Sequence, residues 1–292
     1  SAPAYISEIS PAKSRGSLVA IYQLSIVSGI LVAFLSNYLL NDSGVNAWRW
    51  MLGVGAFPAA FYALMILMVP ESPRWLAMKG RIKEATAVLK KIDPLTDVNA
   101  YFAEIQSHTP ATTKENIFSR KYSRALMLVF FIAFFNQLSG INAFLYYSPR
   151  IFEGAGLGND SAFLSSVGVG LVNVVFTLVG MALIDRLGRK QLMYIGSVGY
   201  ILSLGLVTLS FIQGWGGMAV PIFFFVFIAS HAIGQGTVIW VFIAELFPTH
   251  LRAGGQAFGS SVHWVLAALI PSFIPLLFET VGAGVVFGVF TT

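Results

Sequence analysis

The sequence contains no cysteine and few charged residues for its length of 292. Without cysteine it offers no disulfide bond, no thiol catalysis and no thiolate metal site. Charged residues make up 11% of the sequence, whereas soluble domains carry about 25%, and 56% of the residues are hydrophobic. This composition indicates an integral membrane protein in a lipid bilayer. It also argues against a nucleic-acid partner, in spite of the net charge of +5.

The residue patterns of enzymes are missing as well. The four histidines form no pair with a glutamate at metal-ligand spacing, so no metal site is predicted. The glycine-rich stretch 154–158 lacks the lysine that follows a phosphate-binding loop. We therefore expect a protein that is not an enzyme and that uses no cofactor.

Long apolar runs divide the chain into seven full spans and one partial span, each full span needing about 20 apolar residues. The runs lie at residues 17–40, 50–69, 125–148, 162–184, 191–212, 218–244 and 255–278, with the partial one from 281. The sequence begins with Ser and ends inside the partial span, so we expect it to be part of a longer protein.

The basic residues predict the orientation of the spans. Sixteen of the 18 Lys and Arg residues precede the first span or lie in alternate connections, ten of them between Arg74 and Arg124. The other connections hold only Arg49 and Arg150. Because basic residues gather on the cytoplasmic side, this pattern predicts a multi-pass protein of the cell membrane with residues 71–124 in the cytoplasm.

Three parts are expected along the chain. Residues 1–70 are assigned to the end of one helical half, residues 71–124 to a cytoplasmic linker of amphipathic helices, and residues 125–292 to a second helical half. Ser72 and Pro73 predict a helix start inside the linker, and residues 109–116 predict an irregular connection. A repeat supports two related halves, because Glu, Pro and Arg have the same offsets in 8–15 and 245–252.

A cluster of polar residues follows the apolar run 125–135. The stretch 136–149 combines Asn136, Gln137 and Asn142 with Gly140, which permits a helix break, and Pro149, which we expect to end the helix. Unpaired polar groups are costly in hydrocarbon, and broken helices there usually line a cavity. Two interpretations stay open from these residues alone: a substrate site, or hydrogen bonds between helices worth about 1 kcal/mol each.

The polar residues at mid-depth of the spans are neutral, since every Lys and Arg lies at a span end or in a connection. Amides donate and accept hydrogen bonds as sugar hydroxyls require, and an aromatic face covers the apolar side of a sugar ring. A neutral polyhydroxylated ligand is therefore predicted for the candidates Gln23, Asn136, Gln137, Asn142, Tyr146, Asn173, His263 and Trp240. We expect His231 to be a hydrogen-bonded histidine between helices rather than a site residue.

Four motifs resemble those of the sugar porter family of the major facilitator superfamily. They are Pro-Glu-Ser-Pro-Arg-Trp-Leu at 70–76, Gln-Leu-Ser-Gly-Ile-Asn with Tyr-Tyr at 137–147, Asp-Arg-Leu-Gly-Arg-Lys at 185–190, and the stretch 245–252. The resemblance covers essentially the whole sequence. It implies an all-α membrane protein with the helical bundle of that superfamily, from about span 5 to span 11 plus the ends of spans 4 and 12.

The resemblance also implies roles for individual residues. Gln23, Gln137, Asn142, Asn173 and Trp240 match positions that contact the sugar in the family, and Tyr146 is a neighbour or gate. Asn136 stands where relatives often carry the first glutamine of a pair, and His263 stands where they carry an amide. Ile30 replaces a polar group that bacterial xylose–proton symporters have, as in the glucose facilitators.

The expected function is transport of a neutral monosaccharide, a pentose or hexose, by alternating access, as a proton symporter or a facilitator. The expected partners are the sugar, the lipid bilayer and, for a symporter, protons, and the protein is expected to be monomeric. The alternatives are a polyol or inositol transporter and a sugar sensor that binds without transport.

Charged residues at the predicted cytoplasmic ends of the spans need an explanation of their own. Topology alone accounts for the basic residues but not for the matched glutamates. In the family such residues form a latch that exists in only one conformational state and so biases the equilibrium between inward-open and outward-open forms. The resemblance assigns this cytoplasmic gate to Glu8, Arg15, Glu71, Arg74, Asp185, Arg189, Glu245 and Arg252.

Overall fold

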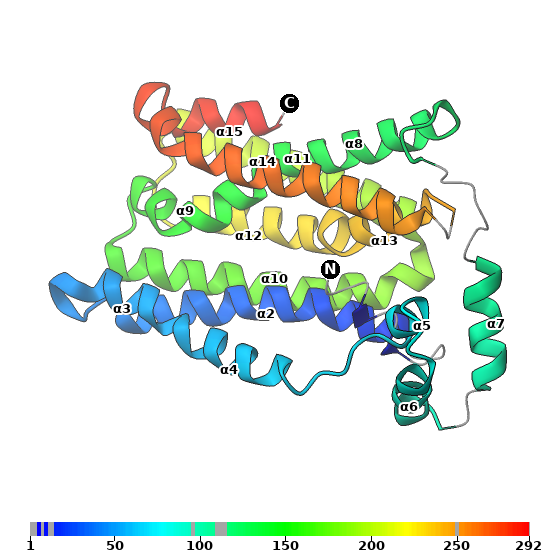
Figure 1. The fold of residues 1–292 in the computed structure, drawn as a ribbon. Coiled ribbons are helices and arrows are strands. Elements are labelled where there is room, and N and C mark those ends of the chain that lie inside the picture. The colour runs from blue at the N-terminus through cyan, green and yellow to red at the C-terminus, as the bar shows by residue number, and fades with distance from the viewer. Residues whose placement is uncertain are drawn as a thin grey trace. The chain divides into compact units, whose positions relative to one another are not determined.

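A computed structural model describes residues 5–6, 9–10, 15–94, 97–108, 116–248 and 251–291. The secondary structure of the described part is helical throughout (Figure 1). The chain separates into two compact units, one made of residues 1–25 and 52–116, the other of residues 26–51 and 117–292. The expected division at residues 70 and 124 remains a prediction.

The first unit contains the apolar helix α4 and three short helices beyond it. They are α4 (Ala56–Ile66), α5 (Pro73–Met78), α6 (Ile82–Ile92) and α7 (Val98–His108), preceded by the first residues of α2 (Arg15–Leu40). The Ser72 side chain accepts a hydrogen bond of 3.3 Å from the backbone N–H of Trp75, so the predicted start of α5 is confirmed. Leu76, Ala85 and Leu89 are the buried apolar residues of α5 and α6.

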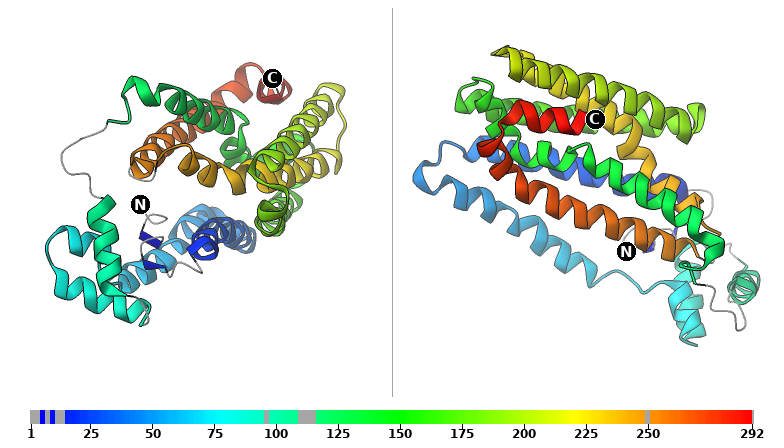
Figure 2. Two further views of the ribbon diagram at one scale, coloured as in Figure 1. Left: turned by 90° about the vertical axis from the view of Figure 1, so that its right-hand side faces the viewer. Right: turned by 90° about the horizontal axis from the view of Figure 1, so that it is seen from above.

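The second unit holds the remaining spans, which run alongside one another in Figure 2. It contains the rest of α2, η1 (Gly44–Asn46), most of α3 (Ala47–Val54), η2 (Arg120–Tyr122), α8 (Ser123–Leu138), α9 (Ile141–Gly154), α10 (Asn159–Leu187), α11 (Arg189–Gln213), α12 (Ala219–His231), the π-helix η3 (Ala232–Gly236), α13 (Thr237–Glu245), α14 (Arg252–Thr280) and α15 (Ala283–Thr291).

Seven helical segments of the described chain are long and apolar enough to cross a membrane, which confirms the seven predicted spans. They cover Ile21–Leu40, Gly44–Ile66, Arg120–Gly154, Asn159–Ile184, Arg189–Gln213, Ala219–Ile243 and Arg252–Thr280. Three of them are composite. The span from Gly44 comprises η1, α3 and α4. The span from Arg120 includes the break between α8 and α9, and the span from Ala219 includes the π-helix.

The break at Gly140 is confirmed. Gly140 has a φ of 76°, in the left-handed region that glycine adopts without steric cost. Its N–H donates to the carbonyl of Gln137 at 3.0 Å and closes α8, while its carbonyl accepts the first bond of α9 from the N–H of Phe144 at 2.9 Å. The break therefore places Gln137 and Asn142 at facing helix ends.

The prediction that Pro149 ends this helix is wrong, because α9 continues through Pro149 to Gly154. Proline lacks an N–H and so deprives the carbonyl of Leu145, four residues earlier, of its helical partner. The hydroxyl of Ser148 lies within hydrogen-bond distance of that carbonyl, at 3.4 Å, and of the Ser166 hydroxyl, at 3.0 Å. Neighbouring hydroxyl groups of this kind allow proline inside membrane helices.

Aromatic rings fill the core of the second unit. Phe144 of α9 packs on Phe224 and Phe227 of α12 with ring centroids 4.7 Å apart, and on Phe287 of α15 at 5.0 Å. All four rings are fully buried. Burial of such rings dominates the packing energy of a helical core, so this cluster joins the half-helix α9 to α12 and α15.

Two glycines bring α11 against the π-helix. A Cβ atom added at Gly196 would lie 2.7 Å from the Cα of Gly234, so the two backbones are in direct contact. Close approach through small residues is a common way of packing membrane helices. Gln235, the next residue of the π-helix, is consequently held beside α11, where its amide nitrogen donates to Ser197 and Tyr200 at 3.3 Å.

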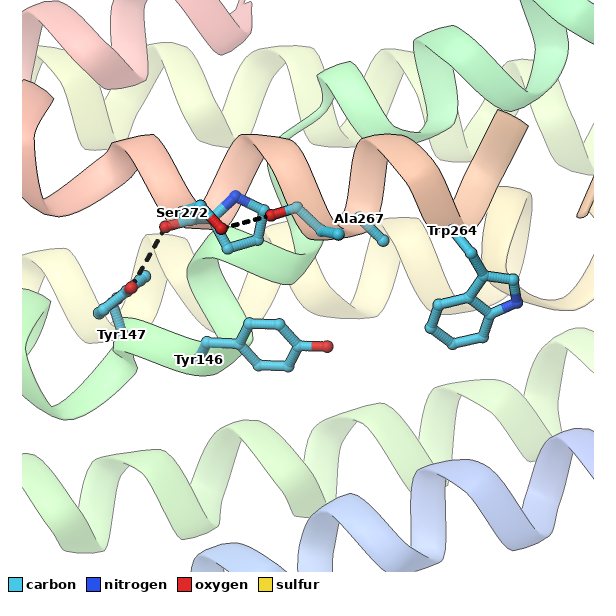
Figure 3. Close-up of a pocket in the computed structure, with 7 residues that line it drawn as sticks. Tyr146, Tyr147, Trp264, Ala267 and Ser272 are labelled. Carbon is cyan, nitrogen blue, oxygen red and sulfur yellow. Dashed lines mark hydrogen bonds between the residues drawn. The ribbon is translucent and has the colours of Figure 1, made fainter. Parts of the chain in front are cut away.

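A proline in α14 creates a hydrogen-bond acceptor for α9. Pro275 has no N–H, so the carbonyl of Pro271, one turn earlier, loses its helical partner. The hydroxyl of Tyr147 donates to that carbonyl at 3.2 Å (Figure 3). The bond joins the half-helix α9 to α14.

We predict that Tyr147→Phe lowers the free energy of unfolding by about 1 kcal/mol, because the carbonyl of Pro271 loses its donor among apolar helices. Thermal unfolding of the detergent-purified protein measures the change. Tyr146→Phe is the matched control, since the Tyr146 side chain is exposed and its hydroxyl makes no hydrogen bond within the described chain. Equal stability of the two variants would contradict the prediction.

Candidate functional site

A continuous chain of side-chain amides crosses the helix break. The Asn136 amide nitrogen donates to the side-chain carbonyl oxygen of Gln235 at 3.1 Å. The Gln137 amide nitrogen donates to the side-chain carbonyl oxygen of Asn136 at 3.0 Å. On the far side of Gly140, the Asn142 amide nitrogen donates to the Gln137 carbonyl oxygen at 2.7 Å. Helices α8, α9 and η3 thus contribute to one network, which we call the amide cluster: Asn136, Gln137, Asn142 and Gln235.

His263 of α14 extends the amide cluster. The amide nitrogen of Gln137 lies 3.0 Å from His263 Nδ1 and 3.1 Å from its Nε2. An amide N–H donates to a ring nitrogen only if that nitrogen carries no proton, so this contact requires the neutral imidazole. The Trp240 ring lies against His263, with ring centroids 4.8 Å apart. The structure therefore brings together Asn136, Gln137, Asn142, Trp240 and His263, all predicted from the sequence.

Gln235 was missed by the sequence reasoning, although it is 6% exposed and links α11 to Asn136. Its signal was present, because a glutamine in the middle of span 218–244 is as unusual as the amides that were selected. The irregular hydrogen bonding of a π-helix, common at functional sites, could not be predicted from the residues.

The other candidates are not joined to the amide cluster. Asn173 of α10 is 8% exposed, and its side chain makes no hydrogen bond in the part of the chain that the structure describes. Gln23 is partly buried in α2 and belongs to the first compact unit. Tyr146 of α9 lies one helical turn beyond Asn142, with 59% of its side chain exposed. Contacts of these three residues with a ligand remain predictions.

An open hollow of about 420 Å³ lies between α9 and α14 (Figure 3). Its lining includes Tyr146, Tyr147, Trp264, Ala267 and Ser272, and Figure 3 shows the rings of Tyr146 and Trp264 along it. The amide cluster does not line the hollow directly. The two are nevertheless adjacent, because Tyr146 follows Asn142 by one turn of α9 and Trp264 follows His263 in α14.

Trp264 was also missed, although an exposed tryptophan next to a mid-span histidine carries the same aromatic signal as Trp240. His231 differs from expectation in another way. It is 8% exposed, and its Nδ1 is buried without a hydrogen-bond partner in the described chain, so the expectation of a hydrogen-bonded histidine is wrong for that atom. Its ring packs instead near Phe227, with centroids 6.2 Å apart.

Two residues of the predicted gate form an ion pair within the second unit. Arg189 at the start of α11 lies 3.3 Å from Glu245 at the end of α13, with 37% and 51% of their side chains exposed. Glu71 is exposed and Arg74 is partly buried in the first unit, and Arg252 is exposed at the start of α14. Glu8 and the side chains of Arg15 and Asp185 lie outside the described residues. The latch as a whole remains a prediction.

Comparisons with known proteins give a consistent result. Residues 1–292 match the family described as "Sugar (and other) transporter". The arabinose-proton symporter of Bacillus subtilis is 33% identical over 98% of this chain and 64% of its own length. A probable polyol transporter 4 of Arabidopsis thaliana is 36% identical over 99% of this chain and 58% of its own length.

A solved structure shares the fold. The partially occluded, inward-open structure of the xylose transporter XylE from E. coli matches with a TM-score of 0.84 and 26% identity, over 99% of this chain and 63% of that one. The chain belongs to the sugar porter family of the major facilitator superfamily. This family consists of transporters rather than enzymes.

Membership of the sugar porter family confirms the predicted fold class, an all-helical membrane bundle of the facilitator type. The chain spans less than two thirds of the length of these three relatives. Among the residues that the structure describes, no group of three or more His, Asp or Glu side chains is placed to bind a metal ion.

We predict that Glu245→Gln shifts this sugar porter away from its outward-open state, because Arg189 loses its anionic partner at the predicted cytoplasmic end. An exposed ion pair is worth about 0.2–1 kcal/mol, so a shift of up to about fivefold in the state equilibrium is expected. Thiol labelling of single cysteines, introduced at the two ends of the spans because the sequence has none, reports the shift.

Glu84→Gln is the matched control for this experiment. It removes the same charge from an exposed pair, 2.6 Å long, between Arg81 and Glu84 near the start of α6. Arg81 and Glu84 are only three residues apart at the start of one short helix, so their ion pair does not join two spans. An unchanged equilibrium in Glu245→Gln, or an equal change in Glu84→Gln, would leave topology as the explanation of the charges.

Proposed function

We propose that the protein transports a neutral monosaccharide, a pentose or hexose, across a membrane by alternating access. The observation that carries this proposal is the amide cluster at the break between α8 and α9, with His263 and Trp240 beside it. Every member is uncharged when His263 accepts a hydrogen bond, so the cluster suits hydroxyl groups better than phosphate or carboxylate.

The amide cluster retains hydrogen-bonding capacity for a ligand. Gln137 uses its side-chain carbonyl oxygen on Asn142 and its amide nitrogen on Asn136 and His263. The side-chain carbonyl oxygen of Asn142, in contrast, accepts no hydrogen bond within the described part of the chain. Asn142 is partly buried rather than enclosed. A sugar hydroxyl that donates to Asn142 would need no rearrangement of the other amides.

The neighbouring hollow is of a suitable kind for the rest of a sugar. Ligand pockets usually have volumes of about 300–1,000 Å³ and combine apolar walls with a few polar groups. Tyr146 and Trp264 supply aromatic faces for the C–H side of a sugar ring, and Ser272 supplies a hydroxyl. A monosaccharide bound between Asn142 and these rings would contact α9 and α14 together.

The names of relatives support both the substrate class and coupling to protons. One relative is named as an arabinose-proton symporter, and the solved structure is that of a xylose transporter. We propose a monomeric protein of the cell membrane with residues 71–124 in the cytoplasm. Uptake into proteoliposomes with and without a pH gradient distinguishes a symporter, which accumulates sugar only with the gradient, from a facilitator.

A polyol is the second candidate substrate, favoured by the 36% identity to a probable polyol transporter. An open-chain polyol presents hydroxyl groups but no ring face for Trp240 to cover. Competition between a panel of monosaccharides and a panel of polyols for binding separates the two candidates. Preference for ring sugars supports the first proposal, and preference for polyols overturns it in favour of the second.

We predict that Gln137→Ala weakens sugar binding by about tenfold or more, because Asn142 loses the amide that orients it, and the hydrogen bond that Asn142 makes to the sugar is worth about 1–3 kcal/mol. Calorimetry measures the affinity, and thermal unfolding of the same sample measures stability. Gln256→Ala is the matched control, since Gln256 is a partly buried glutamine of α14 outside the amide cluster. If Gln137→Ala loses stability but keeps its affinity, the cluster only joins helices.

A further inference from the structure

Helix α15 packs against the break between α8 and α9. A Cβ atom added at Gly140 would be 2.7–2.9 Å from three carbon atoms of the Phe290 ring. The ring is therefore in contact with the backbone of Gly140, one of the two residues between α8 and α9. Contact at this distance is possible only because glycine has no side chain.

A second ring of α15 covers the other end of the first turn of α9. Phe287 stacks on Phe144 with ring centroids 5.0 Å apart and an interplanar angle of 14°. Both side chains are fully buried. Since the N–H of Phe144 donates to the carbonyl of Gly140, the two aromatic contacts hold the two ends of one hydrogen-bonded turn.

Asn142 lies in the middle of that turn. Its amide bonds to Gln137 across the break at 2.7 Å, so the rotation of the turn sets the distance between the two amides. Glycine at the break imposes little restriction on this rotation. The rings of α15 supply a restriction that the local backbone lacks.

We propose that Phe290 and Phe287 are positioning residues for sugar binding: they press on Gly140 and Phe144 and thereby hold Asn142 against Gln137 in the geometry that accepts a sugar hydroxyl. The proposal rests on the proposed function. It adds the helix α15, whose contribution comes from the apolar rings of Phe287 and Phe290 instead of a polar contact with the ligand. Sites bind well when neighbouring packing holds the contacting groups within about 0.5 Å of the productive geometry.

A different role would be simple filling of the aromatic core. Phe211 of α11 separates the two possibilities, because its ring packs on Phe287 from another helix at 5.2 Å and belongs to the same apolar cluster. Val285 of α15 is 55% exposed and serves as a second control on the same helix. Neither control changes a residue that takes part in the contacts of Phe290 with Gly140 and of Phe287 with Phe144.

The experiment compares Phe290→Leu with Phe211→Leu and Val285→Ala in the whole protein, with D-xylose and D-glucose as probes. We expect Phe290→Leu to weaken binding of the better probe by up to about tenfold, the value of one hydrogen bond, and to change the ratio of the two affinities. Phe211→Leu should lower the unfolding temperature without changing the affinity or the ratio. If Phe290→Leu does not fold, Phe290→Met carries the same test.

A double-mutant cycle shows whether Phe290 acts through Asn142. In an Asn142→Ala background, Phe290→Leu should change the affinity by no more than about twofold, because the side chain that it positions is gone. If the two effects multiply, or if Phe290→Leu and Phe211→Leu change affinity equally, the positioning role is wrong. If Asn142→Ala and Gln137→Ala both leave affinity unchanged, the proposed sugar site itself is wrong.

Discussion

The structure depends on one constraint: a polar group placed among apolar membrane helices must find its partner within the protein. The amides of Asn136, Gln137, Asn142 and Gln235 pair with one another across the three helical elements α8, α9 and η3. The same constraint explains the bond from Tyr147 to the carbonyl that Pro275 leaves without a helical donor. Pairing of this kind fixes α9 relative to α14 and gives the second unit a defined polar interior.

The break at Gly140 converts this interior into a candidate binding site. An uninterrupted helix would place Gln137 and Asn142 five residues apart, on different faces, whereas the left-handed glycine brings their amides within 2.7 Å. The side-chain carbonyl oxygen of Asn142 remains available to accept a hydrogen bond from a ligand. The hollow beside Tyr146 and Trp264 begins one helical turn from Asn142. Backbone geometry, amide chemistry and aromatic surface therefore meet at the start of α9, with Phe290 packed behind it.

The sequence was sufficient to predict the seven spans, the break at Gly140, the start of α5 at Ser72, and Gln137 with four of the residues that gather near it. Each of these has a local signal, namely an apolar run, a glycine among amides, or a capping pair. The role of Gln235 depends on the contact of Gly196 with Gly234 and on a π-helix, both tertiary features. Pro149 was misjudged because the helix tolerates it through Ser148. Gln23 and Asn173 keep only the support of the family resemblance.

The absence of cysteine from these 292 residues permits a direct test that sugar binds beside the amide cluster. A thiol introduced by Tyr146→Cys would line the hollow one turn from Asn142, while Asp42→Cys places one in an exposed connection. Sugar at ten times its dissociation constant should slow maleimide labelling of Tyr146→Cys by about tenfold and leave Asp42→Cys unchanged. Labelling of Tyr146→Cys that is indifferent to a bound sugar would contradict the account.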